Sequence, residues 1–329
     1  MLTTGAAEQF DLFSQTHLCA GFTSLAQTSQ PAPKKSSRTL VPGLSLSVLG
    51  SGSGGNCSVL RLAGTDGKAD AILVDAGFGP RRTARKLAEA GLGFADIRAV
   101  CVTHFDRDHF KPTLIRTLVK HEIPIFCHHW HLPELTALRG AEQLFNLGLV
   151  EPFGDGILLP MPGVTATTTR LQHDLQGTIA FRFTTRFGDI GYATDLGHAP
   201  RQLIEHFAGV DLLCIESNYD HGMTIHSSRP SFVNRRNLSD SGHLSNEQAF
   251  EAVQQIADRS PHGNPRRVVL LHRSSQCNHP TKVRRVFEQD PALARRVIQT
   301  QQRRRTRWFG VRPLRNVQRS QLCLASARD

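Results

Sequence analysis

The chain has 329 residues, of which 39% are hydrophobic and 20% charged, and a formal net charge of +11. This composition predicts a globular protein of one large domain or two ordinary ones, and it excludes a disordered chain. No segment approaches the roughly 18 consecutive apolar residues that span a membrane. Glu8 and Asp11 interrupt the region where a signal peptide would be apolar. We therefore expect a cytoplasmic protein without membrane contact.

The first half of the chain predicts strands, loops and one helix. Residues 1–42 are expected to lack regular structure, because they contain a polar, proline-containing stretch without periodicity. From Leu44 on, LSLSVLG alternates as a strand does, SGSGGN predicts a tight turn, and CSVLRL predicts the partner strand. AILVDAG at 71–77 predicts a buried strand that opens into a loop. A helix ending at Gly91 and a strand at 98–102 should follow.

The second half continues this pattern. Strands are expected at 123–127, 210–215 and 268–271, and a hairpin at 179–184 and 189–193. A helix should begin after Ser245, because Gln248 follows three residues later, as in a capping box. Mixed strands and helices without an internal repeat predict sheets that are covered by helices.

Positive charge is concentrated near the C-terminal end. Between Lys282 and Arg319, twelve lysines and arginines stand against two acidic residues, a net charge of +10, which leaves +1 for the rest. A basic hairpin is expected near 297–312, and its charge favours an acidic or phosphate-bearing partner such as nucleic acid. The arginines predicted to bind nucleic acid are Arg303, Arg304, Arg305 and Arg307. Two plainer explanations stay open: the segment aids solubility, or it reflects a general preference for arginine over lysine.

The segment VTHFDRDHF carries the strongest chemical signal. His104, Asp106, Asp108 and His109 lie within six residues, directly after a predicted buried strand. Buried charge is costly unless it is paired, so four such side chains at a strand end favour metal binding over a chance surface cluster. The seven cysteines contain no Cys-x-x-Cys pair, so neither a disulfide framework nor a thiolate zinc site is expected.

Further candidate ligands follow other predicted strands or precede predicted elements. They are His173 in LQHD, Asp195 in ATDLG, His243 in SGHLSNE and His272 in LLHRS. Six or seven nitrogen and oxygen ligands are too many for one tetrahedral zinc ion. They suit two metal ions about 3.5–4 Å apart that share an aspartate and a hydroxide.

Taken in order, eight segments of the chain resemble the metallo-β-lactamase-fold hydrolases, and within them the YycJ/WalJ branch, a group associated with nucleases. The matching segments are SGSGGN, ILVDAG, THFDRDH, LQHD, ATDLG, IESNYD, GHLSNE and LLHRSSQCN. The resemblance implies an α+β fold, an αββα four-layer sandwich with the metals at one edge of the sheets. It places this domain at 43–315, followed by a tail at 316–329.

The resemblance also implies a ligand set for two divalent ions, Zn²⁺ or Mn²⁺. His104, Asp106 and His173 would hold one ion, Asp108, His109 and His272 the other, and Asp195 would bridge them. Asp106 stands where the family usually has a histidine. Because a carboxylate is a harder ligand than imidazole, this change favours Mn²⁺ or Mg²⁺ at that site, and single-metal occupancy stays open.

The predicted mechanism is attack on phosphorus by a hydroxide that bridges the two metals. Asp108 would orient the nucleophile. His243 would contact a phosphate or donate the proton to the leaving oxygen, unless it only docks the Ser245 helix. Supporting or substrate-contacting roles are expected for Asn56, Glu216, Asn218 and Asn278. CHHWH at 127–131 is interpreted as a surface feature and not as a second metal site.

Three functions are compatible with these residues. The first is a metal-dependent phosphodiesterase, and from the resemblance a 5′-to-3′ exonuclease on double-stranded DNA. The second is a metal-dependent hydrolase of small esters, thioesters or lactams, since one fold hosts many chemistries. The third is a non-catalytic nucleic-acid-binding protein whose metal site Asp106 has degraded.

Overall fold

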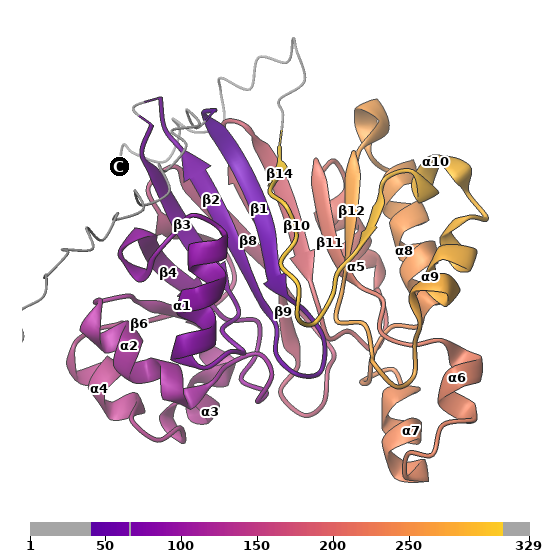
Figure 1. Cartoon of the computed structure of the whole chain (residues 1–329), viewed down its shortest axis with the longest axis horizontal. Helices are drawn as coiled ribbons and strands as arrows, with labels where there is room; N and C mark the ends of the chain where they lie inside the picture. The colour runs from indigo at the N-terminus through magenta and orange to yellow at the C-terminus, as the bar shows by residue number, and fades with distance from the viewer. Residues whose placement is uncertain (1–40, 66, 312–329) are drawn as a thin grey trace, which may run out of the picture. The chain divides into compact units, whose positions relative to one another are not determined.

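The computed structural model describes residues 41–65 and 67–311. The predicted lead-in up to residue 40 and the predicted tail at 316–329 lie outside the described residues. Within them, two seven-stranded sheets pack face to face, and helices cover the outer face of each sheet (Figure 1). This arrangement confirms the predicted αββα sandwich. None of the described helices is long and apolar enough to cross a membrane.

The first sheet has the strand order β14-β1-β2-β3-β4-β5-β6. Its strands are β1 (Gly43–Gly50), β2 (Cys57–Ala63), β3 (Ala69–Val74), β4 (Ile97–Cys101), β5 (Ile125–His128), β6 (Val150–Phe153) and β14 (Phe309–Gly310). From β3 to β6 the neighbours are parallel, so their carboxyl ends meet at one edge.

The second sheet has the order β13-β12-β11-β10-β9-β8-β7. Its strands are β7 (Ile157–Met161), β8 (Val164–Leu171), β9 (Thr178–Thr185), β10 (Gly188–Ala193), β11 (Leu212–Glu216), β12 (Arg267–Leu271) and β13 (Val297–Gln299). The predicted hairpin is confirmed, because β9 and β10 pair antiparallel. Strands β10 to β13 are parallel, and β8 runs in the same direction as β10.

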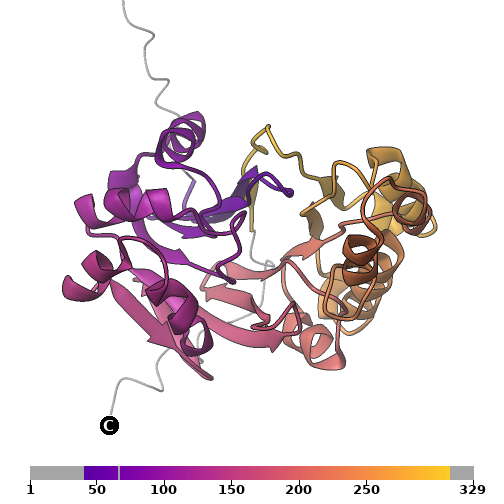
Figure 2. The ribbon, with the colours of Figure 1, turned by 90° about the horizontal axis from the view of Figure 1, so that it is seen from below.

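Helices on the two outer faces bury separate apolar clusters. The first sheet is covered by α1 (Pro80–Glu89), α2 (Ile115–Lys120), α3 (Leu132–Thr136) and α4 (Ala141–Asn146). The second is covered by α5 (Arg201–Phe207), α8 (Asn246–Asp258), α9 (Pro280–Phe287) and α10 (Pro291–Ala294). Figure 2 shows both helical layers from below, with the sheets between them. A third apolar cluster fills the space between the sheets.

Two further helices and four short 3-10 turns complete the described chain. The helices are α6 (His221–Ile225) and α7 (Ser231–Asn237), and the turns are Phe94–Asp96, Pro112–Leu114, His129–His131 and Pro261–Gly263. The predicted capping box at α8 is confirmed: the Ser245 hydroxyl accepts from Gln248 N–H, and the Gln248 side chain accepts from Ser245 N–H. This cap, worth about 1 kcal/mol, holds the helix that follows His243.

The predicted basic hairpin at 297–312 is wrong. β13 pairs with β12 in the second sheet, whereas β14 pairs with β1 in the first sheet. Residues 300–308 therefore form a strap that crosses from one sheet to the other. Alternation of apolar residues indicates a strand but carries no information about its partner, and here an existing sheet edge accepts each strand in place of its neighbour in the sequence.

Candidate metal centre

The loop after β4 supplies four of the predicted ligands. It turns back on itself, because the N–H groups of His109 and Phe110 both donate to the carbonyl oxygen of Asp106. His104 and His109 are buried, whereas the Asp106 side chain is 43% exposed. Gly77 allows this loop to approach β3, since a Cβ there would overlap the backbone carbonyl of Asp108.

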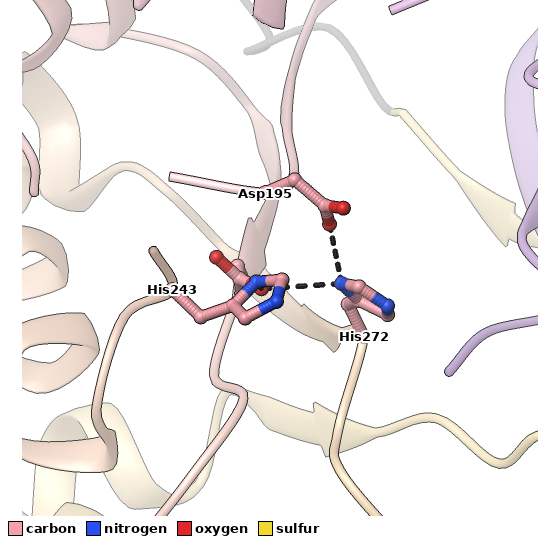
Figure 3. Close-up of side chains that lie close together, drawn as sticks. Asp195, His243 and His272 are labelled. Atoms are coloured by element: carbon pink, nitrogen blue, oxygen red, sulfur yellow. Dashed lines mark hydrogen bonds and ion pairs between the residues drawn. The ribbon is translucent and has the colours of Figure 1, made fainter. Parts of the chain in front are cut away.

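The carboxylate of Asp195 is the common point of the centre. Its Oδ2 lies 3.3 Å from His104 Nε2 and 3.1 Å from His109 Nε2. The same oxygen lies 3.7 Å from His173 Nε2, and Oδ1 contacts His272 Nδ1 (Figure 3). Asp195 is 2% exposed. Four imidazoles from three separate parts of the chain therefore surround one buried carboxylate.

Among the described residues, four groups of ligand-capable atoms have all their atoms within 4.8 Å of one another. Two of them contain Asp195, together with His104 and His109 in one and with Glu216, His243 and His272 in the other, and the remaining two are triads without it. The first triad is His104, Asp106 and His173, and the second triad is Asp108, His109 and His272. These are the two sets that the resemblance implied. Imidazole nitrogens and carboxylate oxygens are suitable ligands for Zn²⁺ and Mn²⁺, so the donor set of each triad fits a divalent ion.

Hydrogen bonds at the far nitrogen of three rings direct the other nitrogen inward. His109 Nδ1 lies 2.8 Å from Asp75 Oδ2, and His173 Nδ1 lies 2.9 Å from the carbonyl oxygen of Gly242. His104 Nδ1 lies 2.9 Å from the Thr103 hydroxyl. Such outer bonds fix ring orientation in metal sites. His104 Nε2 is buried and, beyond its ion-pair contact with Asp195, has no hydrogen-bond partner among the described residues, which leaves it available to a metal.

Asp75 was not singled out from the sequence as a site residue. Its Oδ1 accepts from the N–H and the hydroxyl of Thr103, and its Oδ2 faces His109. It therefore ties the end of β3 to the end of β4. The available signal was its position directly after the apolar run AILV, because Asp195 similarly follows an apolar strand.

The Asp195 carboxylate and the rings of His109 and His272 stabilise each other's charged forms. Burial alone would raise the pKa of Asp195, but His109 and His272 hold it well below its ordinary value. Burial alone would lower the pKa of His109 and His272, but Asp195 and neighbouring carboxylates raise both well above the ordinary value. The carboxylates of the centre therefore attract positive charge. Protons on the histidines and metal cations compete to provide it.

Glu216, at the end of β11, forms the floor beneath His243 and His272. Its Oε1 lies 2.8 Å from His243 Nδ1 and 3.2 Å from His272 Nδ1, and Oε2 accepts from two backbone N–H groups. Burial would raise the pKa of Glu216, but the charge and hydrogen bond of His243 lower it to about 2. Because Nδ1 of His243 is engaged, Nε2 is the nitrogen that it can offer to a substrate.

The three predicted asparagines have different surroundings. Asn56 reaches the centre, with Nδ2 3.2 Å from Asp108 Oδ2 and 2.9 Å from His109 Nε2. Asn218 donates to the carbonyl oxygen of His272. Asn278 lies farther back: its amide donates to the carbonyl oxygen of Asn218 and to the Asn246 side chain. Of its two predicted roles, the structure supports loop positioning, because these partners already engage the amide.

Three residues of the centre have left-handed backbone conformations. Asp75, Asp195 and His272 have φ of 60°, 57° and 50°, and each follows the end of a strand. A non-glycine residue in this region costs about 1–3 kcal/mol and persists only where its surroundings hold it. Here the N–H of His272 donates to the Ser51 hydroxyl, and its carbonyl accepts from Asn218.

The centre opens into a cavity of about 410 Å³. One part of its lining comes from the predicted site: Asp106, Asp108, His173, Asp195, Asn218, His243 and His272. Arg229 and Arg236, from the segment that carries α6 and α7, line the same cavity. The sequence did not single out these two arginines, because they belong to no motif and only the fold brings them to the centre.

The four arginines predicted to bind nucleic acid lie in the strap and line no part of this cavity. Arg303, Arg304 and Arg307 are exposed, and Arg305 is half-buried with Nη1 3.1 Å from the Ser47 hydroxyl. The strap lies against the SGSGGN turn, where the Gln302 side chain accepts from Gly54 N–H and donates to the Gly55 carbonyl. The strap is thus hydrogen-bonded to the turn that ends at Asn56.

The interpretation of CHHWH as a surface feature is only partly right. Trp130 is 47% exposed and His129 is exposed, but His128 and His131 are buried. Burial lowers the pKa of His128 to about 4. The alternation expected for an extended segment fails because residues 129–131 form a 3-10 turn, for which the His128 side chain accepts from Trp130 N–H.

This geometry agrees with the family comparison. A model described as "Beta-lactamase superfamily domain" matches residues 70–273, a range that contains both triads and Asp195. The chain belongs to this superfamily, and it is a hydrolase with the metallo-β-lactamase fold. The resemblance to the metallo-β-lactamase-fold hydrolases is thereby confirmed.

Individual relatives extend the comparison. The exodeoxyribonuclease YycJ of Bacillus anthracis is 30% identical over 242 residues, 72% of this chain and 84% of the relative. The exodeoxyribonuclease WalJ of Streptococcus pneumoniae serotype 2 is 25% identical over 261 residues, 75% of this chain and 90% of the relative. The solved metallo-beta-lactamase fold protein YhfI of Bacillus subtilis has a TM-score of 0.58 at 15% identity and covers 81% of this chain and 99% of its own.

Proposed function

We propose that the protein is a metal-dependent phosphodiesterase that acts as a 5′-to-3′ exonuclease on double-stranded DNA. The observation that carries the proposal is the pair of ligand triads joined by the buried carboxylate of Asp195. The relatives that are named exodeoxyribonucleases support the choice of DNA as the substrate.

In this proposal each triad would hold one divalent ion, and the Asp195 carboxylate would be available to both. Zn²⁺ or Mn²⁺ suits the second triad, and Mn²⁺ or Mg²⁺ suits the first, because Asp106 adds a hard oxygen ligand. Divalent ions there would supply Lewis acidity, which activates water near neutral pH and neutralises charge on a phosphate.

Two protein side chains have defined tasks in the reaction. Asp108 accepts a hydrogen bond from the attacking water and orients its oxygen toward phosphorus, while Asn56 holds the carboxylate in place. As the water oxygen bonds to phosphorus and one of its protons passes to solvent, the bond to the leaving oxygen breaks, and His243 Nε2 gives that oxygen its proton. Glu216, 2.8 Å from His243 Nδ1, holds the ring so that Nε2 is the nitrogen available to the leaving oxygen.

The proposed site of action is the cytoplasm, with nucleic acid as the partner. The five cysteines that the structure describes are all free thiols, as is usual in a reducing compartment. The cationic strap suits phosphate contacts that do not depend on base sequence. No particular observation favours small esters as substrates or a degraded metal site, since Asp106 lies within the first triad.

The test is a degradation assay on linear duplex DNA labelled at either end, with RNA and closed circular DNA alongside. Metal-stripped protein is assayed with Mn²⁺, Zn²⁺ or Mg²⁺ added back, and Asp195→Asn serves as the inactive control. Metal-restored loss of the 5′ label from linear duplex alone is the expected result. Cleavage of circular DNA, or no cleavage with any of the metals, would contradict the proposed activity.

A further inference from the structure

We propose that Arg229 and Arg236 form a phosphate clamp that holds the scissile phosphodiester against the metal triads. The inference rests on the proposed function and deepens it, because it assigns substrate binding to a segment outside the recognised motifs. The segment at 221–237 carries α6 and α7, and we call it the helical arm (Figure 1).

The shared cavity is the first argument for the clamp. Asp106, Asp195 and His243 line it together with the two arginines. The cavity therefore has a wall of metal-binding groups and a cationic group that does not belong to either triad. A phosphodiester carries its negative charge on two oxygens, so it can face the triads with one side and a guanidinium with the other.

Each arginine also connects the helical arm to a loop that follows a ligand histidine. Arg236 forms two hydrogen bonds with the carboxylate of Asp174, the residue after His173. Arg229 Nε lies 2.6 Å from Gln276 Oε1, in the loop that follows His272. These contacts position both guanidinium groups beside the triads.

The state of Arg236 suits phosphate binding. Its side chain is 49% exposed, so a substrate can reach it. The hydrogen bond from Asp174 raises its pKa, as do the charges of Asp106 and Asp195, so it remains charged. A planar guanidinium has five N–H donors, and its two bonds to Asp174 leave others free for a phosphate.

A purely structural role would require the arginines only to hold the helical arm in place. Asp174→Asn separates the two roles, because it removes the negative charge beside Arg236 while the amide oxygen can still accept one hydrogen bond and keep the guanidinium in position. Asp174 has φ of 41°, and asparagine tolerates this region well, so the change introduces little backbone strain. If Arg236 binds phosphate, Asp174→Asn should leave DNA affinity unchanged or increase it.

Arg235 provides the matched control. It is adjacent to Arg236 on α7, it is exposed, and it does not line the cavity. Arg235→Ala and Arg236→Ala therefore remove the same charge from the same helix. A difference between them reports the position of the side chain and not the net charge of the protein.

The experiment measures duplex DNA binding by fluorescence anisotropy, in an Asp195→Asn background that does not turn the DNA over. Loss of a charged hydrogen bond of about 1.5–3 kcal/mol corresponds to a loss of affinity of about 10- to 100-fold. We expect this for Arg229→Ala and Arg236→Ala, with partial recovery in Arg236→Lys. Arg235→Ala and Asp174→Asn should bind within about threefold of the parent, the usual range of a surface change.

Any other pattern overturns the clamp: unchanged affinity in the two clamp variants, an equal loss in Arg235→Ala, or a loss in Asp174→Asn that matches Arg236→Ala. Protection of the metal-loaded, otherwise unmodified protein against thermal unfolding by inorganic phosphate gives a second measurement, which does not require DNA. The protection should vanish in Arg236→Ala. If that occurs in a protein that cleaves no DNA, the clamp stands and only the proposed exonuclease activity fails.

Discussion

The two triads share Asp195 but differ in how firmly their other groups are held. In the second triad, Asp108 is 3.2 Å from both Asn56 and His272, and Asp75 fixes His109. In the first triad, the Asp106 side chain is 43% exposed, and its carboxylate lies 3.9 Å from His104 Nε2. A ligand that is already in position costs less entropy on binding. The second triad should therefore bind its ion more tightly than the first.

The largest expected effect is that of Asp195→Asn, which acts on both triads at once. The amide removes the negative charge that the four histidines share, so we expect kcat to fall about 10³-fold or more, the scale of losing a key electrostatic group. Asparagine accepts a φ of 57°, so far-UV circular dichroism should match the parent. An Asp195→Asn variant that kept full nuclease activity would contradict the proposed mechanism.

Metal content should then distinguish the triads. His109→Ala is expected to lose the ion of the second triad, whereas Asp106→Ala should keep it and lose only the first. After dialysis against a weak chelator, elemental analysis should find less metal per chain in His109→Ala than in Asp106→Ala. If both variants retained the same amount of metal per chain, the two triads would not differ in metal affinity as proposed.

Asp75→Asn should weaken the second triad more than the first, because Asp75 contacts His109 directly and reaches His104 only through the Thr103 hydroxyl. Loss of an outer partner of a ligand histidine typically weakens metal affinity about 10- to 100-fold, and Asp75 contacts His109 directly. Zinc titration with a competing chromophoric chelator would measure the change. Thr103→Val is a matched comparison, because it removes the hydroxyl beside His104 and should weaken the first triad in its place.

The smallest effect is expected outside both triads, at His128. Its folded-state pKa of about 4 lies below the ordinary 6.5, so between these values the unfolded chain binds a proton that the folded chain does not. Stability should therefore fall as pH decreases through this window. His128→Asn keeps a side-chain acceptor for Trp130 N–H and should reduce the loss between pH 7 and pH 5 by about 1 kcal/mol. Urea unfolding at the two pH values measures it, and an unchanged loss would exclude His128 as a source of acid sensitivity.

The family resemblance implied the sandwich and the division of the ligands into two triads. The short motifs at the ends of apolar strands indicated only that the ligand-capable residues would meet at one site. Parallel strands bring such ends to one edge whatever the loops between them do. Asp75 was missed because a single aspartate after a strand is not distinctive. Its role becomes visible only when β3 and β4 lie side by side.

Other features depend on distant contacts that no local pattern carries. Arg229 and Arg236 reach the cavity only through the path of the helical arm. The hairpin prediction failed because β13 and β14 found partners in different sheets. In each case the deciding contact joins residues far apart in the sequence. Periodicity and composition do not predict such contacts.

The pairing of β14 with β1 has a consequence for how the protein is made. Gly310 lies opposite Ser45, so the first described strand receives its outer partner only after almost the whole described chain has left the ribosome. Until then the outer edge of β1 offers unpaired N–H and C=O groups to other chains. A nascent or prematurely terminated polypeptide would thus keep a strand edge that can pair with other chains. Chaperone binding during synthesis would then protect β1 until β14 is made.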